Sequence, residues 1–225
     1  MWDNFIGQQI RRCNRNLLIW NIAFLFAITT FASMFDYSEG GWSSLLITIP
    51  MLLIAGWNLS NWKKRVQDYT RHPICKRLAS FGTLEQLIQE IETTILTNPE
   101  EKIAGVKVVG PWLFKSTVFG LTCFHVKDIV WVYQKVTSHS VNLIPTGKSF
   151  AALLLDRHGY SAEILAGKDK VEALMAHICQ QSPWIVAGFS KDLEKMWKSK
   201  KAEFIAAVDE RRKDFAKATA ASAGR

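Results

Sequence analysis

The sequence predicts an α+β protein. We expect an N-terminal transmembrane α-helical hairpin, then a curved β-sheet or partial barrel with flanking helices, and a C-terminal basic amphipathic helix. Three observations predict this order. Two long stretches near the N-terminus lack charge, the hydrophobic period changes to two after Lys102, and the segment from Ser190 to Lys217 is basic and free of proline and glycine. We therefore divide the chain into residues 1–73, 74–189 and 190–225.

The composition excludes several classes of protein. Of the 225 residues, 48% are hydrophobic and 21% are charged, which excludes a disordered or low-complexity chain. Four cysteines are too few for a disulfide scaffold, and we expect reduced thiols. The net charge of +8 divides into +3, +1 and +4 over the three segments. A nucleic-acid-binding domain would concentrate positive charge on its folded middle, so we expect no nucleic-acid partner.

Two charge-free stretches predict membrane spans. Residues 17–35 read LLIWNIAFLFAITTFASMF and residues 42–59 read WSSLLITIPMLLIAGWNL. As a helix, the first would extend roughly 28 Å, about the thickness of a hydrocarbon core. Pro50 should kink the second helix. The intervening DYSEGG leaves room for a tight turn, so the two helices should be antiparallel neighbours.

The residues that flank the spans predict their orientation. Basic residues precede the first span and follow the second, whereas the loop has Asp36 and Glu39 and neither Lys nor Arg. The positive-inside rule therefore predicts a two-pass protein with both termini in the cytoplasm. The predicted membrane-flanking residues are Arg11, Arg12, Arg15, Lys63, Lys64, Arg65, Trp42, Trp57 and Trp62. Two buried core helices, or a signal peptide, are the alternatives.

The middle segment begins with a helix and continues with short strands. Thr83 is a good N-cap, and Asn98-Pro99 should end the helix. We predict strands at residues 103–109, 112–115, 119–126, 129–136, 140–144, 150–155 and 160–165. Turns are predicted at residues 110–111, 127–128, 145–147 and 157–159, and a last helix at residues 168–180.

The strand at residues 129–136 is apolar on both of its faces. Alternation places Ile129, Trp131 and Tyr133 on one face, and Val130, Val132 and Gln134 on the other. We therefore expect a central strand that is covered on both sides.

Several segments carry a resemblance to a known family. They are HPICKRLASFG (72–82), PWLF (111–114), VKDIVWVYQKVTSHSVNLIPTGKS (126–149) and the closing helix. Over residues 1–180 the chain resembles uncharacterised bacterial membrane proteins in which a two-span hairpin precedes a pleckstrin-homology-like (PH-like) domain. The resemblance implies a fold rather than an activity. Phosphoinositide-binding PH domains use a basic cluster in the first hairpin, where this chain offers Lys107 and Lys115, so no lipid-binding residue is carried over.

Catalytic and cofactor motifs are weak. Pro145-Thr-Gly-Lys-Ser149 mimics the end of a phosphate-binding loop, but Asn142 stands where that loop needs Gly or Ala, and no helix pattern follows directly. A hairpin turn is the better interpretation. The histidines lack metal-ligand spacing, and Asp156-Arg157-His158 reads as a solvated turn. We expect no enzymatic activity, cofactor, metal or small-molecule substrate.

The basic tail is predicted to be helical with an intermittent apolar stripe. It could lie on an anionic membrane leaflet, dock on a partner or a second copy, or pack on its own domain. The residues predicted to make its contacts are Trp197, Lys198, Lys200, Lys201, Phe204, Val208, Arg211 and Arg212.

Together these features suggest a non-enzymatic function at a membrane. The leading hypothesis is a membrane-tethered scaffold or accessory subunit that presents its cytoplasmic domain to a membrane-protein partner or a second copy. The alternatives are an anionic-lipid sensor, acting through the domain or the tail, and a component of an oligomeric transporter. The resemblance places the protein in a bacterial inner (plasma) membrane.

Overall fold

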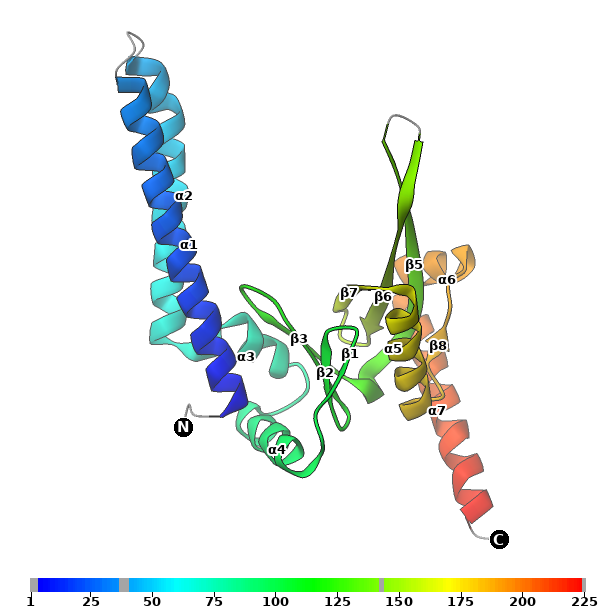
Figure 1. The fold of residues 1–225 in the computed structure, drawn as a ribbon. Helices are drawn as coiled ribbons and strands as arrows, with labels where there is room; N and C mark the ends of the chain where they lie inside the picture. The colour runs from blue at the N-terminus through cyan, green and yellow to red at the C-terminus, as the bar shows by residue number, and fades with distance from the viewer. Residues whose placement is uncertain (1–3, 37–40, 142–143, 224–225) are drawn as a thin grey trace. The chain divides into compact units, whose positions relative to one another are not determined.

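The structure is a computed structural model that describes residues 4–36, 41–141 and 144–223 (Figure 1). The chain forms two compact units. Unit 1 contains residues 1–92 and 116–121, and unit 2 contains residues 93–115 and 122–225. The coarse expectation of a mixed α+β fold, with a long apolar N-terminal helix followed by sheets and helices, is confirmed. The sequence-based boundaries at residues 73 and 189 stay a prediction.

Unit 1 begins with two long helices that lie side by side, α1 (Phe5–Asp36) and α2 (Gly41–Gln67) (Figure 1). Both extend beyond the apolar stretches, because α1 starts well before Leu17 and α2 continues past Leu59. Helix α2 runs through Pro50 as one element. A short 3-10 turn, η1 (Tyr69–Arg71), and helix α3 (Pro73–Leu78) follow.

His72 joins η1 to α3 and caps the N-terminus of α3. The backbone N–H of Ile74 donates to His72 Nδ1 at 3.3 Å, which requires an unprotonated nitrogen. The residue is 1% exposed. Its burial, and secondarily the positive charge of Arg65, lower the pKa of His72 from 6.5 to about 4.

Acidification is expected to destabilise unit 1 through His72. Because its folded-state pKa lies below the unfolded value, the stabilisation is complete above about pH 6.5 and is lost as the pH falls towards 4. At pH 5 the loss amounts to about 2 kcal/mol. His72→Asn keeps a capping acceptor that does not titrate, so melting of the full chain in detergent should depend less on pH between 7 and 5. Equal pH dependence of the two proteins would contradict this assignment.

Helix α4 (Leu84–Thr97) follows the predicted pattern. Its first turn is closed by the N–H of Leu87 donating to the Thr83 carbonyl, and at its end the Asn98 N–H donates to the Thr94 carbonyl. Leu87 and Ile91 are buried on its inner face. The predicted start at Thr83 and stop at Asn98-Pro99 are confirmed.

Sheet A is the antiparallel meander β1-β2-β3-β4. Its strands are β1 (Glu101–Ile103), β2 (Val106–Val109), β3 (Trp112–Ser116) and β4 (Leu121–His125). The predicted strand at residues 103–109 is in fact a hairpin, because Ala104 (φ 52°) and Gly105 (φ 75°) form a two-residue turn. The predicted turn at Gly110-Pro111 is confirmed by the pairing of Val109 with Trp112.

Sheet B has the order β7-β6-β5-β8. After the 3-10 turn η2 (Val126–Asp128), β5 (Ile129–Val141) and β6 (Ile144–Asp156) form a long antiparallel pair, and β7 (Ser161–Ala166) lies along β6. The short strand β8 (Val186–Ala187) pairs in parallel with Trp131 and Val132. Neither sheet closes on itself within the described residues, so a partial barrel is not confirmed.

Two predictions in the β5–β6 pair are wrong. The predicted strand at residues 140–144 belongs to the ends of β5 and β6, and the predicted turn at residues 145–147 lies inside β6. Pro145 pairs with Ser140 and Gly147 pairs with His139, so one extra residue on β6 is absorbed as a register shift. A bulge therefore accommodates the Pro-Gly signal that usually marks a turn.

The main core of unit 2 lies between the two sheets and helix α5 (Lys168–Gln181). Sheet A contributes Val106, Val108, Leu113 and Phe124 to this core, and sheet B contributes Ile129, Val132, Ala152, Leu154 and Ile164. Helix α5 contributes the predicted stripe of Val171, Leu174 and Ile178.

A second core lies on the other face of sheet B. It contains Val130, Trp131 and Leu155, which pack against Phe204 and Val208. The predicted burial of β5 on both faces is confirmed, but the predicted alternation is wrong at its start. A register shift between Ile129 and Trp131 puts Val130 on the same side as Trp131, and puts Ile129 with Val132.

The basic tail forms two helices, α6 (Lys191–Ser199) and α7 (Lys201–Ala223). The Ser190 side chain caps α6 by accepting from the Leu193 N–H at 3.1 Å. Lys200 lies between the helices with φ −138° and ψ 46°. This break lets both Trp197 and Phe204 contact the Trp131 ring, with centroids 6.2 and 5.7 Å from it.

Candidate membrane interface

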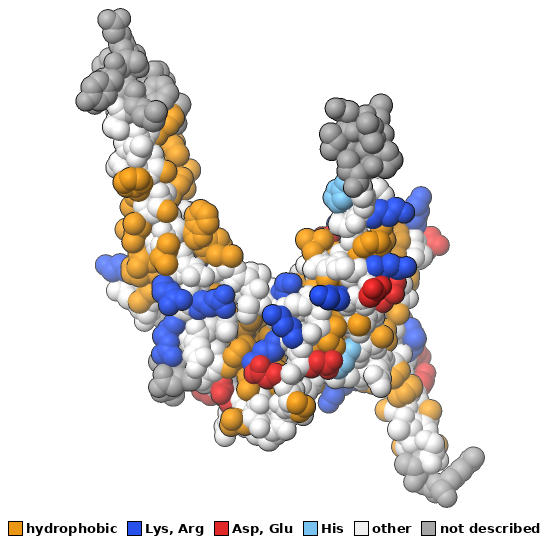
Figure 2. All heavy atoms as spheres, viewed as in Figure 1, with side chains coloured by type: hydrophobic (Ala, Val, Ile, Leu, Met, Phe, Trp, Pro, Cys, Tyr) orange, Lys and Arg blue, Asp and Glu red, His pale blue; other side chains and the backbone are white. Residues whose placement is uncertain are grey.

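Helices α1 and α2 expose large apolar side chains along the described part of their length (Figure 2). Phe26 is 71% exposed and Leu53 is 69% exposed. The other exposed ones are Ile19, Trp20, Ile22, Ile49, Leu52, Ile54, Trp57, Leu59 and Val66. Helix α1 from Phe5 to Ser33 is long and apolar enough to cross a membrane, and only 11% of its most apolar part is buried. A core helix of a soluble protein would bury most of this surface.

The basic residues that flank these apolar stretches gather at one end of the helix pair, which we name the basic collar. Its members are Arg11, Arg12, Arg15, Lys63, Lys64 and Arg65. Figure 2 shows Lys and Arg side chains at the end of the pair where α1 begins and α2 ends. All are exposed except Arg65, which is half-buried.

The tryptophans differ in their surroundings. Trp62 Nε1 donates to the Asn14 carbonyl of α1 at 3.1 Å, so this residue ties the two helices together beside the basic collar. Trp57 is 68% exposed. Trp42 lies near the start of α2, outside the residues whose side chains the structure describes. Sequence reasoning missed Trp20, whose position early in the first apolar stretch was the available signal.

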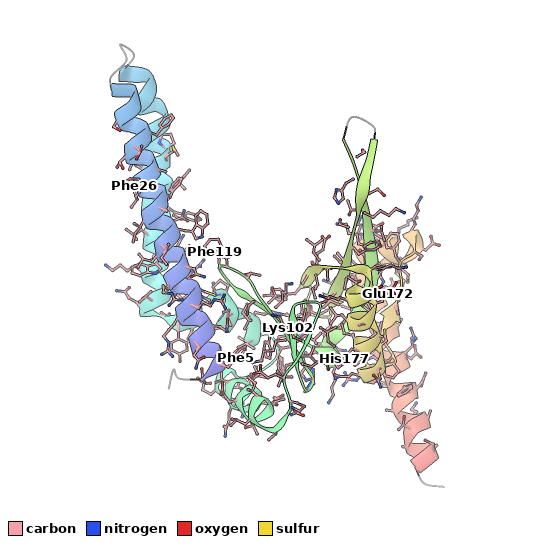
Figure 3. The ribbon with its side chains drawn as sticks, in the orientation of Figure 1. Phe5, Phe26, Lys102, Phe119, Glu172 and His177 are labelled. Carbon is pink, nitrogen blue, oxygen red and sulfur yellow. The ribbon has the colours of Figure 1, made fainter. Side chains whose placement is uncertain are left out.

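A small hollow, which we name the helix-pair pocket, opens between the two helices. Its volume is about 220 Å³. The lining residues are Leu17, Trp20, Asn21, Phe24, Ile54, Asn58 and Phe119. Phe119 comes from the loop between β3 and β4, in the part of the chain that belongs to unit 1 (Figure 3). Sequence reasoning placed Phe119 in a strand and so missed its contact with α1.

The apolar residues of the tail are occupied by its own unit. Phe204 and Val208 are each 2% exposed and pack against Val130 and Trp131. The side chain of Trp197 is half-buried in the same cluster. Of the three alternatives for the tail, this packing favours the one in which it covers its own domain, and it removes these side chains from contacts outside unit 2.

Several basic residues of the tail also have partners within unit 2. Lys198 Nζ donates to Glu194 at 2.5 Å, and Lys200 donates to Glu203 at 3.1 Å. The Lys201 Nζ lies 4.6 Å from the centre of the Trp197 ring, and the Arg212 guanidinium lies 5.3 Å from that of Trp184. Arg211 is exposed.

A half-buried ion pair links α7 to the turn that follows β6. Arg157 Nη2 donates to Asp209 Oδ1 at 2.5 Å, and its Nε lies 3.3 Å from Asp128 Oδ1. The backbone N–H of Arg157 also donates to the Asp128 carbonyl. Sequence reasoning read Asp156-Arg157-His158 as a solvated turn, whereas Asp156 is fully buried and Arg157 is the link to the tail.

Comparison with known families matches the middle of the chain. A family model described as a domain of unknown function, DUF6709, matches residues 83–197, just over half of the chain. The chain belongs to the DUF6709 family. The DUF6709 region starts at α4 and reaches Trp197 of α6, so it includes both sheets, α5 and β8. Helices α1, α2 and α7 lie outside it. Comparison with the curated proteins and with the solved structures gives no match.

The structure gives the positions of the sequence motifs that could have suggested a catalytic, phosphate or metal site. Residues 145–149, the phosphate-loop mimic, lie inside β6, whose next element is strand β7. The backbone of a strand does not cradle a phosphate as a loop leading into a helix does. All four cysteines are free thiols, and no group of three His, Cys, Asp or Glu near enough to hold a metal occurs among the described residues.

Proposed function

We propose that the chain is a membrane-tethered, non-enzymatic scaffold or accessory subunit that presents its DUF6709 domain beside a bilayer. The observation that carries this proposal is the exposed apolar surface of α1 and α2, bounded at one end by the basic collar. Apolar surface of this extent is costly in water and stable in a hydrocarbon core. A tethered domain meets membrane partners at a raised effective concentration.

We further propose a two-pass topology with both termini in the cytoplasm, in a bacterial inner (plasma) membrane. Its support is the position of the whole basic collar on one end of the helix pair, because Lys and Arg are retained on the cytoplasmic side. A tag inserted at Gly40 should be labelled only from outside the cell, and tags at the two termini only after the membrane is opened. Labelling of the Gly40 tag from the cytoplasm alone would reverse the topology.

The domain fits a PH-like description. Four antiparallel strands, three further antiparallel strands and the helix α5 follow in order, and α5 packs with the facing sides of both sheets. Strand β8 and helices α6 and α7 would then be additions that cover the outer face of sheet B.

The proposed contact surface for a partner is the end of the β5–β6 pair. Strand β7 pairs with residues 150–155 and β8 with residues 131–132, so residues 137–141 and 144–149 lack a third strand among the described residues. Open strand edges accept an added strand from another protein. Affinity capture of the full chain from detergent-solubilised membranes should recover the same partner repeatedly. Repeated recovery of the bare chain would contradict a scaffold.

An anionic-lipid sensor is the second candidate function. An open hollow of about 660 Å³ is lined by Gln8, Gln9, Arg11, Arg12 and Arg15, where a lipid headgroup could meet several positive charges. With the full chain in nanodiscs, anionic lipid should slow amide exchange around these residues, and high salt should reverse the effect. Equal exchange in neutral and anionic lipid would exclude this candidate. The oligomeric transport component stays a prediction from sequence.

A further inference from the structure

The helix-pair pocket has the form of a site for one lipid molecule. We propose that it binds a phospholipid, with part of an acyl chain between its apolar walls and an ester carbonyl that accepts a hydrogen bond from Asn21. This inference rests on the proposed function, since it needs α1 and α2 to lie in a bilayer.

Asn21 is the observation that points to a ligand. The residue is 5% exposed, and its Nδ2 has no hydrogen-bond partner among the residues that the structure describes. A buried amide N–H₂ group without an acceptor is costly. A molecule that brings an acceptor into the pocket would satisfy this group.

The depth of Asn21 in the bilayer indicates which group of a lipid would accept its hydrogen bond. It lies six residues beyond Arg15 of the basic collar, which is roughly 9 Å along a helix. The polar headgroup region on one side of a bilayer is about 5–8 Å thick. A collar at the level of the phosphates therefore places Asn21 near the boundary of the hydrocarbon core, where the ester carbonyls of phospholipids are found.

The walls and size of the pocket favour an acyl chain of the same phospholipid as its occupant. Trp20, Phe24 and Ile54 are apolar, and the Phe119 ring meets the Trp20 ring edge-on, with centroids 6.0 Å apart. A volume of about 220 Å³ holds a segment of a flexible chain. A helix from a second copy, about 10 Å across with its side chains, is too wide to enter it.

The loop that carries Phe119 is fixed to α1 by polar contacts. Asn16 Nδ2 donates to the Val118 carbonyl at 2.8 Å, and the Ser116 hydroxyl lies 3.3 Å from Gln9 Oε1. Val118 and Phe119 are 54% and 45% exposed. The loop tip is thus a third apolar element at the level where α1 enters the bilayer, and it forms a side wall for the lipid.

The test compares two lipids that differ in the ester carbonyl. The full chain is mixed with equal amounts of a diester and a diether phosphatidylglycerol of the same chain length, and retained lipid is counted by native mass spectrometry. We expect the wild-type chain to retain the diester form about three- to tenfold better, the range for one hydrogen bond in a membrane. Asn21→Leu should remove this preference.

Two further variants keep the test decisive. Thr29→Val removes a hydroxyl from the same helix that already donates to the Phe26 carbonyl, so it should leave the preference unchanged. Phe119→Ala should lower the total lipid retained and keep the preference, because the wall is lost but Asn21 remains. A wild-type chain that retains no lipid, or both lipids equally, overturns the proposal, as does an unchanged preference in Asn21→Leu. If any of these results is obtained while the wild-type chain still fractionates with membranes, the lipid site is refuted and the proposed function stands.

Discussion

Trp131→Ala is expected to lower the free energy of unfolding of unit 2 by about 3–5 kcal/mol. Trp131 is 1% exposed, and its Nε1 donates to the Gly188 carbonyl at 2.7 Å. Its ring lies within 4.6–6.5 Å, centre to centre, of the rings of Tyr133, Phe189, Trp197 and Phe204. Alanine would leave a large cavity and an unpaired carbonyl between β5, the segment after β8, and both tail helices.

Thermal or denaturant unfolding of the full chain in detergent would measure this loss. Trp131→Phe keeps most of the apolar contact and removes the hydrogen bond, so about 1 kcal/mol of destabilisation is expected. Leu165→Ala is the matched control on sheet B, because Leu165 is 63% exposed and its truncation should change stability by less than about 0.5 kcal/mol. Faster amide exchange confined to α6 and α7 in Trp131→Ala would show that the tail detaches first. Unchanged stability in this variant would refute the second core.

Replacing both Ile22 and Phe26 by arginine is expected to abolish stable insertion of α1 into membranes. The two side chains are 59% and 71% exposed, so in water the change would cost little. An arginine at the middle of a spanning helix costs about 2.5–3.5 kcal/mol on insertion scales. Phe26 lies deeper than Asn21 and should carry most of this cost, whereas an arginine at position 22, near the boundary of the core, costs less because its side chain can reach the interface. The substitutions therefore separate a lipid-facing surface from a water-facing one.

Carbonate extraction of membranes, followed by detection of the full chain, reads out this difference. The double variant should move from the pellet to the extract or be degraded. Leu96→Arg changes a residue of α4 that is 84% exposed and lies outside the apolar stretches, so this variant should stay in the pellet. Retention of the double variant at the wild-type level would show that α1 does not face lipid.

Local patterns predicted those elements that are specified by neighbouring residues. Helices α4 and α5 follow from the spacing of their apolar residues and from their end signals, and the turn at Gly110-Pro111 follows from its two residues. The bulge at Val130 and the strand pairing of Pro145 depend on contacts with a distant strand, so periodicity alone gave the wrong face and a false turn. The break at Lys200 also depends on a distant strand, because it lets Trp197 and Phe204 pack against Trp131 of β5.

The candidate membrane interface was only partly predictable, because some of its contacts join residues that are distant in the sequence. Charge counting along the chain identifies the basic collar, because its members flank the apolar stretches. The helix-pair pocket was not predictable, since Asn21 and Phe119 line it from positions about a hundred residues apart in the sequence. The burial of Phe204 and Val208 likewise needs sheet B, which the tail sequence does not contain.

The far part of the β5–β6 pair belongs to neither core of unit 2. The described pairs from Thr137 with Ser149 to Val141 with Ile144 lie beyond the reach of β7 and β8. Adding or deleting matched residues there, two on each strand, would preserve which side chains face which way. This arm can therefore change its length during evolution without disturbing the rest of the fold, and its reach is a property that related proteins can tune independently.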